Sequence, residues 1–328
     1  MNEIVKIIDK NLKKALNKHL EKADLTSDIT MDEMKGFESL NLRNSGICNI
    51  KGLEYAVNLK ELNLNNNRIL DISPLKNLVG LKRLFIANNY LSNIDILGDL
   101  TNLNMLTLSN NARIANFTSL EKLTCLRGLY LSKNNIVNIE FLKELKNLIW
   151  LSISENKIKD ISFLSNLVNL HELNISLNKI EDISPLESLI NLTRLDLSFN
   201  KIRNIEPLIY LNTLEYLNLA ANKIDDVSVL ENNIFLKTLN ISSNNVSDIS
   251  KLDYLDLNEL NASNQKIQIL NFANCFEING LDNKVRLKIY LCEGEFDKSG
   301  VISFEFKDNY NAAINYKYNG YLMLRLKY

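Results

Sequence analysis

A unit of about 22 residues recurs along most of this chain and limits the possible fold more than any other feature. It has the form L-x-x-L-x-L-x-x-N-x-I-x-x-I-x-x-L-x-x-L-x-x, and eleven copies follow one another between residues 37 and 278. A unit this short cannot bury its apolar side alone, so the copies must stack into a solenoid. The spacing is 22 except for one of 23 and one of 21, and the copies start at Phe37, Leu59, Leu81, Leu103, Leu126, Leu148, Leu170, Leu192, Leu214, Leu236 and Leu257.

Each position of the repeat has a physical reason. The L-x-L stretch has a period of two, which predicts a short strand with inward leucines, and the strands of successive repeats stack in parallel. Position 9 is Asn from Asn67 to Asn244, and only the end repeats depart, with Ser45 and Gln265. An Asn amide there can satisfy backbone groups that the turn would leave unpaired. The three prolines all fall at position 16, which suits the first turn of a short helical segment.

These features predict a leucine-rich-repeat solenoid of the α/β class, with a curved parallel β-sheet on its concave face. A repeat array also needs caps at its ends. Residues 1–36 are expected to form a helical cap, because Ile4, Ile8, Leu12, Leu16 and Leu20 recur every four residues between residues 3 and 20. A second short helix is expected from Thr30, where T-M-D-E reads as a capping box with Glu33.

The C-terminal end has a different pattern. The repeats occupy residues 37–278, and residues 279–328 show alternating apolar and polar residues, which predict a small β-rich cap of three or four antiparallel strands. The runs include Val285–Leu291 and Ile302–Phe306, and the Asn319-Gly320 turn before Leu322 is typical of a hairpin. This cap could instead be a small binding domain.

Composition limits the setting and the chemistry. The net charge is −1, so no overall field attracts nucleic acid, and no segment has the roughly 18 apolar residues of a membrane span. We see no secretion signal and expect a cytoplasmic monomer; a secreted or cell-surface protein is the alternative. Four cysteines are expected to be buried or partly buried thiols, with a Cys275–Cys292 bridge as the one pairing to test. No catalytic motif appears, so we expect no enzyme activity, no cofactor and no metal site.

Outward positions of the strands give the candidate binding surface. Positions 3, 5 and 7 flank the inward leucines and are mostly small or polar, so large residues there have no packing role. Aromatic and Arg side chains dominate protein-binding hot spots. The candidate protein-binding residues, which include two at position 8 at the start of the loops, are Phe85, Tyr130, Trp150, Leu177, Arg194, Asp196, Phe199 and Tyr216. Scattered apolar surface is the alternative interpretation of this set.

Lysines recur at position 10 and should form a basic line along one rim. Such a line could meet an acidic partner or phosphates, or it could be a solvated edge. Its members are Lys157, Lys179, Lys201, Lys223 and Lys266.

The N-terminal stretch IVKIIDKNLKKALNKHLEKADLTSDITMDEMKGFESLNL, the segment ICNIKGLEYAVNLKELNLNNN and the Asn-rich N-K-I-x-D-I-S-P-L repeats resemble the cap and repeats of bacterial internalins. The resemblance covers about residues 1–278. It implies a receptor-binding array that contacts a protein partner on its concave strand face. In internalins an immunoglobulin-like domain of about 100 residues follows the repeats, whereas the tail here has about 50. The repeat also resembles the regulatory subunit of protein phosphatase-1, an intracellular scaffold.

Three functions follow from these patterns. The first is a protein-binding module of the internalin type, and a regulatory scaffold is its intracellular counterpart. The second is a structural, self-assembling repeat protein, because the tail ends in LMLRLKY, which could form an unpaired strand edge. The third is an enzyme whose site would have to lie in the tail.

Overall fold

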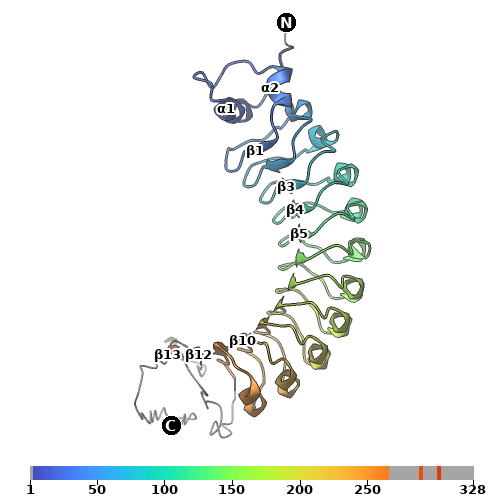
Figure 1. Ribbon diagram of the computed structural model, residues 1–328, viewed down its shortest axis with the longest axis vertical. Helices are drawn as coiled ribbons and strands as arrows, with labels where there is room; N and C mark the ends of the chain where they lie inside the picture. Colours follow the sequence, from blue (N-terminus) through green and yellow to red (C-terminus); the bar gives the residue numbers. More distant parts are fainter. Residues whose placement is uncertain (1–2, 266–287, 291–300, 304–328) are drawn as a thin grey trace. The chain divides into compact units, whose positions relative to one another are not determined.

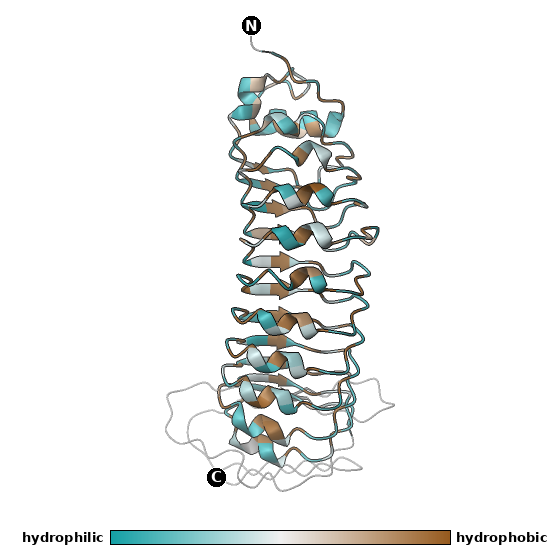
Figure 2. Ribbon diagram, turned by 90° about the vertical axis from the view of Figure 1, so that its right-hand side faces the viewer, coloured by the Kyte–Doolittle hydropathy of each residue, from teal (hydrophilic) through white to brown (hydrophobic). Residues whose placement is uncertain are grey.

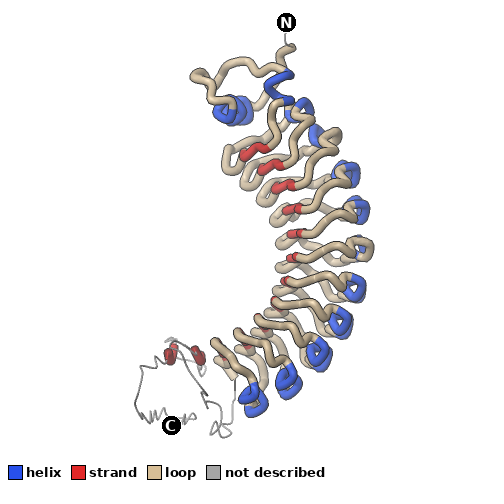
Figure 3. The backbone as a smooth tube through the Cα atoms, in the orientation of Figure 1, coloured by secondary structure: helices blue, strands red, loops and turns tan. Residues whose placement is uncertain are grey.

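A computed structural model describes residues 3–265, 288–290 and 301–303. The chain divides into two compact units, Met1–Ile158 and Lys159–Tyr328, and each is described by itself. In both units every repeat contributes a three-residue strand, and most contribute a 3-10 helix on the opposite side (Figures 1 and 3). The predicted leucine-rich-repeat solenoid is therefore confirmed.

The first unit contains two α-helices, six strands and five 3-10 helices among its described residues. Its strands pair in parallel and in sequence order, and the inward leucines are in register from Leu40 to Leu151. The helices are α1 (Lys10–His19), α2 (Met31–Lys35), η1 (Leu53–Tyr55), η2 (Ser73–Leu75), η3 (Asp95–Asp99), η4 (Thr118–Lys122) and η5 (Glu140–Leu142). The strands are β1 (Ser39–Asn41), β2 (Glu61–Asn63), β3 (Arg83–Phe85), β4 (Met105–Thr107), β5 (Gly128–Tyr130) and β6 (Trp150–Ser152).

The second unit continues the same pattern. Its repeat strands pair in parallel, with Leu173 to Leu260 in register. The strands are β7 (Glu172–Asn174), β8 (Arg194–Asp196), β9 (Tyr216–Asn218), β10 (Thr238–Asn240), β11 (Glu259–Asn261), β12 (Lys288–Tyr290) and β13 (Val301–Ser303). The 3-10 helices are η6 (Ser162–Asn166), η7 (Ser184–Ser188), η8 (Glu206–Tyr210), η9 (Ser228–Asn232) and η10 (Ser250–Tyr254).

In the repeats that the structure describes throughout, seven inward positions make the core, as the repeat predicts. In the repeat that starts at Leu59, all seven have at most 1% of their surface exposed: Leu59, Leu62, Leu64, Ile69, Ile72, Leu75 and Leu78. Figure 2 shows the 3-10 helices of successive repeats stacked above one another within each unit. Pro74, Pro185 and Pro207 lie in the first turn of their 3-10 helices, where a missing N–H leaves no bond unmade.

The position-9 asparagines form the predicted ladder inside the turns. The Asn67 amide nitrogen donates to the carbonyl oxygens of Leu42 and Leu64 at 2.9 Å, and its oxygen accepts from the Ile47 N–H at 2.9 Å. One side chain thus ties its own turn to the preceding repeat. Asn67, Asn89, Asn111, Asn134, Asn156, Asn200 and Asn244 are buried. The ladder confirms the register of the repeat, because a shifted frame would expose these amides.

The N-terminal cap begins later than the apolar spacing predicts. The expected helix over residues 3–20 is wrong for its first turns, because α1 starts at Lys10 with Asp9 as its N-cap. The preceding segment instead pairs with the strand-like stretch around Ile29: the Val5 N–H donates to the Ile29 carbonyl at 2.8 Å. This pairing buries Val5 and leaves Ile4 and Ile8 exposed. The predicted capping box on α2 is present between Thr30 and Glu33.

Beyond the last repeat the structure describes two short strands. β12 pairs in parallel with β11 and antiparallel with β13, so the first added strand follows the direction of the repeats. The remaining predicted strands, the Asn319-Gly320 turn and the domain boundary at residue 279 lie outside the described residues. Cys275 and Cys292 also lie outside them. Cys48 and Cys125 are free and exposed, so the expectation of buried thiols is wrong for these two.

Candidate protein-binding surface

The outward side chains at positions 3 and 5 of the repeats form one surface in each unit, which we call the strand face. A strand directs alternate side chains to opposite sides, so the buried leucine at position 4 turns both of its neighbours outward. Strands β3, β6, β8 and β9 all follow this pattern, with a buried central residue between exposed or half-buried ones. Phe85, Tyr130, Trp150, Asp196 and Tyr216 are half-buried on this face, and Arg194 is exposed.

In the first unit the strand face brings Trp150 close to Tyr130. Trp150 is in register with Gly128 on β5, which is two residues before Tyr130 and on the same face. Phe85 lies further away, because Thr107 on β4 separates it from Tyr130 across the sheet. The predicted aromatic set is therefore one adjacent pair with a third ring two strands away.

Gly128 leaves room for the Met105 side chain and lies against the Trp150 ring. A Cβ on Gly128 would lie 3.6 Å from Cε3 of the Trp150 ring and would collide with the Met105 thioether. Met105 and Trp150 therefore flank a glycine floor on neighbouring strands and lean towards it. Met105 and Gly128 were not predicted as part of this surface. The signal was available, because a glycine at position 3 occurs in no other repeat.

In the second unit Arg194 and Tyr216 contact each other directly. They are in register on β8 and β9, and the Arg194 guanidinium lies 4.4 Å from the centre of the Tyr216 ring. Burial raises the pKa of the Tyr216 hydroxyl, and the Asp196 carboxylate raises it further. The phenol therefore stays neutral at physiological pH. Asp196 is already engaged, since it accepts from the N–H and hydroxyl of Ser198 at 3.0 and 2.7 Å.

Leu177 and Phe199 lie beside the strand face, where the chain turns out of β7 and β8. They occupy position 8, which has positive φ in every repeat, at 54° for Leu177 and 55° for Phe199. This left-handed region suits Gly or Asn and costs other residues about 1–2 kcal/mol. Both side chains are exposed, at 44% and 54%. The residues at this position are Asn44, Asn66, Asn88, Asn110, Lys133, Glu155, Leu177, Phe199, Ala221, Ser243 and Asn264.

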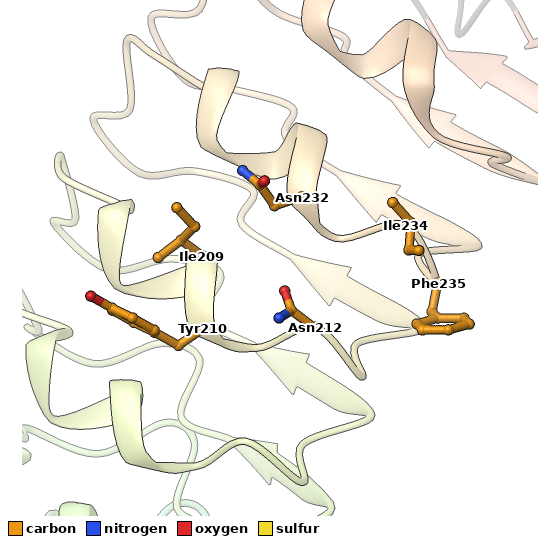
Figure 4. Close-up of a pocket in the computed structure, with 6 residues that line it drawn as sticks. All are labelled: Ile209, Tyr210, Asn212, Asn232, Ile234 and Phe235. Carbon is orange, nitrogen blue, oxygen red and sulfur yellow. The ribbon is translucent and has the colours of Figure 1, made fainter.

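A hollow of about 530 Å³ lies on the opposite side of the second unit, at the turns after η8 and η9 (Figure 4). Phe235 stands at position 22, where several other repeats carry an Asn or Thr side chain that donates to the preceding repeat. Asn191 donates in this way to the Val168 carbonyl at 2.9 Å, and Thr213 to the Ile190 carbonyl at 2.8 Å. Sequence reasoning missed this break in the pattern. The hollow is lined by Ile209, Tyr210, Asn212, Asn232, Ile234 and Phe235.

The described residues hold neither a metal-ion cluster nor a membrane-spanning helix. Among residues 3–265, 288–290 and 301–303, no three His, Cys, Asp or Glu side chains cluster as a metal ion would need. In the same part of the chain, no helix is long and apolar enough to cross a bilayer.

Comparison with known proteins identifies the family. A family model described as leucine-rich repeats (two copies) matches residues 57–99, 146–188 and 190–232. No curated protein matches the chain. Among solved structures, internalin F from Listeria monocytogenes is 29% identical, with coverage of 88% of this chain and 96% of that chain and a TM-score of 0.59. A plant peptide hormone receptor, RGFR1 in complex with RGF2, is 25% identical, with coverage of 65% of this chain and 37% of the receptor chain and a TM-score of 0.57.

Internalin C2 from Listeria monocytogenes has the higher identity. It is 37% identical to this chain, with coverage of 65% of this chain and 93% of internalin C2, and the TM-score is 0.62. The helical cap, the repeat length and the asparagine ladder agree with this similarity. The chain therefore belongs to the internalin family of leucine-rich-repeat proteins.

Proposed function

We propose that this chain is a non-enzymatic protein-binding module and that it holds its partner on the strand face. The observation that carries the proposal is the position of Trp150. It is the one tryptophan of the chain, and it lies half-buried on the strand face rather than in the core. A half-buried aromatic ring on an outward face, beside Tyr130 and next to Gly128, has the character of a binding anchor.

Two further facts support the proposal. Arg194 stacks on Tyr216 on the same face of the second unit, and Arg and Tyr are both enriched at binding hot spots. The plant receptor similar to this chain was solved in complex with RGF2, so a similar repeat array binds a ligand there. Here we extend that use to a protein partner of this chain.

The experiment compares partner capture by the parent chain with capture by the double variant Trp150→Ala and Tyr130→Ala. We expect affinity for the captured partner to fall at least a hundredfold, as is usual when two central anchors are truncated. Tyr254→Ala is the matched control, because Tyr254 is 72% exposed and lies on η10, away from the strand face. Equal capture by the parent and the double variant would rule out the first-unit strand face as the binding site.

Trp150 also gives a direct readout. As the sole tryptophan, it reports any partner that covers it through a shift in its fluorescence emission. A purified partner that binds without changing this emission would contact another surface. Cell fractionation tests the predicted cytoplasmic location against the secreted or surface alternative, and light scattering tests the predicted monomer.

A further inference from the structure

From the loops that follow β7 to β9 we infer a second contact surface, which binds an acidic peptide segment carrying a bulky apolar residue. We call it the loop edge, and it consists of Leu177, Phe199, Lys179, Lys201 and Lys223. The inference rests on the proposed function as a protein-binding module. It adds the chemistry of the partner, which the strand face alone does not indicate.

The two apolar side chains lie next to each other. The Leu177 N–H donates to the Ser198 carbonyl, and the Phe199 N–H donates to the Ala220 carbonyl, each at 2.8 Å. These bonds place the same position of consecutive repeats at the spacing of neighbouring strands, about 4.8 Å. Both side chains are exposed, so Leu177 and Phe199 present one continuous apolar surface.

In the first unit several residues at position 8 bind one another through their side chains. In the first unit Asn88 donates to Asn66 at 2.7 Å, Asn110 donates to Asn88 at 2.8 Å, and Lys133 pairs with Glu155 at 3.1 Å. Leu177 and Phe199 can make no such links, and their left-handed backbone favours Asn over either residue. Folding therefore gives no reason for two large apolar residues here, whereas a partner that covers them does.

The lysines lie immediately beside the apolar pair. In each repeat position 9 points inward, so positions 8 and 10 on either side of it face out, and Leu177-Asn178-Lys179 and Phe199-Asn200-Lys201 share this arrangement. Backbone bonds align the lysines as well: the Lys201 N–H donates to the Ile180 carbonyl and the Lys223 N–H to the Ile202 carbonyl, each at 2.8 Å.

The charge at the loop edge is only partly balanced. Lys201 is 3.6 Å from Glu181, and Arg203 pairs with Asp225 at 2.7 Å. Within the described part of the chain, Lys179 and Lys223 make no ion pair. Two unpaired ammonium groups beside an apolar pair complement a segment with a bulky apolar side chain between carboxylates. A nucleic acid would match the lysines but would leave Leu177 without an apolar contact.

The probe is a labelled twelve-residue peptide with one central Phe flanked on both sides by Asp and Glu. Fluorescence polarisation should detect its binding to the full chain, with weaker binding at higher salt. The double variant Leu177→Asn and Phe199→Asn should weaken binding at least tenfold, and Lys179→Gln with Lys223→Gln at least threefold. Val137→Asn, at another exposed apolar position, is the control and should leave affinity unchanged.

Three results would overturn the inference. One is the absence of detectable binding, and another is equal binding of a peptide in which Lys replaces Asp and Glu. The third is that polyphosphate binds as tightly as the peptide and binds the Leu177→Asn and Phe199→Asn variant with unchanged affinity. This result would make the lysines a general anion site. The peptide titration tests only the loop edge, and the Trp150→Ala and Tyr130→Ala variant tests only the strand face. A failed loop-edge inference is therefore distinguishable from a failed strand-face proposal.

Discussion

At the scale of single residues, position 8 shows how the repeat separates stability from recognition. Leu177→Asn and Phe199→Asn remove apolar contacts of two largely exposed side chains, and they also relieve a left-handed backbone that costs about 1–2 kcal/mol per residue. We expect the two effects to offset, so the free energy of unfolding of the double variant should lie within about 1 kcal/mol of the parent. Urea unfolding measures this free energy. Asn88→Leu is the comparison: it places Leu where the repeat has Asn at the same position, and it should destabilise the chain.

The ladder asparagines have the opposite character. Asn156 donates to the carbonyls of Leu131 and Ile153 at 3.1 and 2.9 Å, and accepts from the N–H groups of Asn134 and Ile136 at 3.0 and 2.9 Å. Asn156→Ala leaves these buried groups without their partner and should cost about 2–4 kcal/mol of unfolding free energy. Lys157→Ala, at the exposed neighbour of Asn156, should cost less than about 0.5 kcal/mol. A loss of similar size in both variants would contradict the role given to the ladder.

At the scale of elements, Asp9 joins the helical cap to the first repeat. One carboxylate oxygen accepts from the N–H groups of Asn11 and Leu12 at 2.8 and 3.0 Å, and the other from those of Cys48 and Asn49 at 2.7 and 2.9 Å. Hydrogen bonds to a charged group contribute about 1.5–3 kcal/mol each at most, and they are not additive. Asp9→Ala should therefore destabilise the chain by about 2–3 kcal/mol.

The same contacts predict a pH dependence. Burial raises the pKa of Asp9, but four backbone N–H donors outweigh it and lower the pKa below its ordinary value. A carboxyl whose pKa is lower when folded stabilises the fold above its unfolded pKa, about 3.9, and loses this effect as the pH falls through the folded value. The stability difference between the parent and Asp9→Ala should thus shrink below about pH 4. Urea unfolding at pH 7 and pH 3 measures this difference, and an equal difference at the two pH values would contradict the role given to Asp9.

The elements also show what the sequence can and cannot predict. The strands, the asparagine ladder and the proline positions follow from a period that eleven repeats share, and all were predicted. The start of α1 was not, because an apolar residue every four positions does not reveal that residues 3–5 pair with residues 29–31. Gly128 and Phe235 were missed for a related reason. Each matters through its neighbours in adjacent repeats, where it forms a floor for Met105 and Trp150 or interrupts a column of donors.

At the scale of the whole molecule, a repeat array is held together by contacts between neighbouring repeats, so distant repeats need not unfold together. Leu239→Ala creates a cavity under β10 and should cost about 2–5 kcal/mol locally. We expect the unfolding midpoint followed by circular dichroism to fall, and the unfolding midpoint followed by Trp150 fluorescence to fall by less than half as much. In Leu129→Ala, on the strand next to Trp150, the fluorescence midpoint should fall at least as far as the circular dichroism midpoint. Coincident midpoints in both variants would show that the array unfolds as one cooperative unit.

The recurrence of a left-handed residue in each repeat has a consequence for how such a chain can change. It provides eleven evenly spaced sites, none of them buried, at which a side chain can be exchanged without disturbing an inward contact. Asparagine is the most frequent residue at this position, and each other residue changes the surface of one repeat independently. Substitutions at position 8 alone can therefore change which partner the array binds, while the buried core of the repeats stays the same.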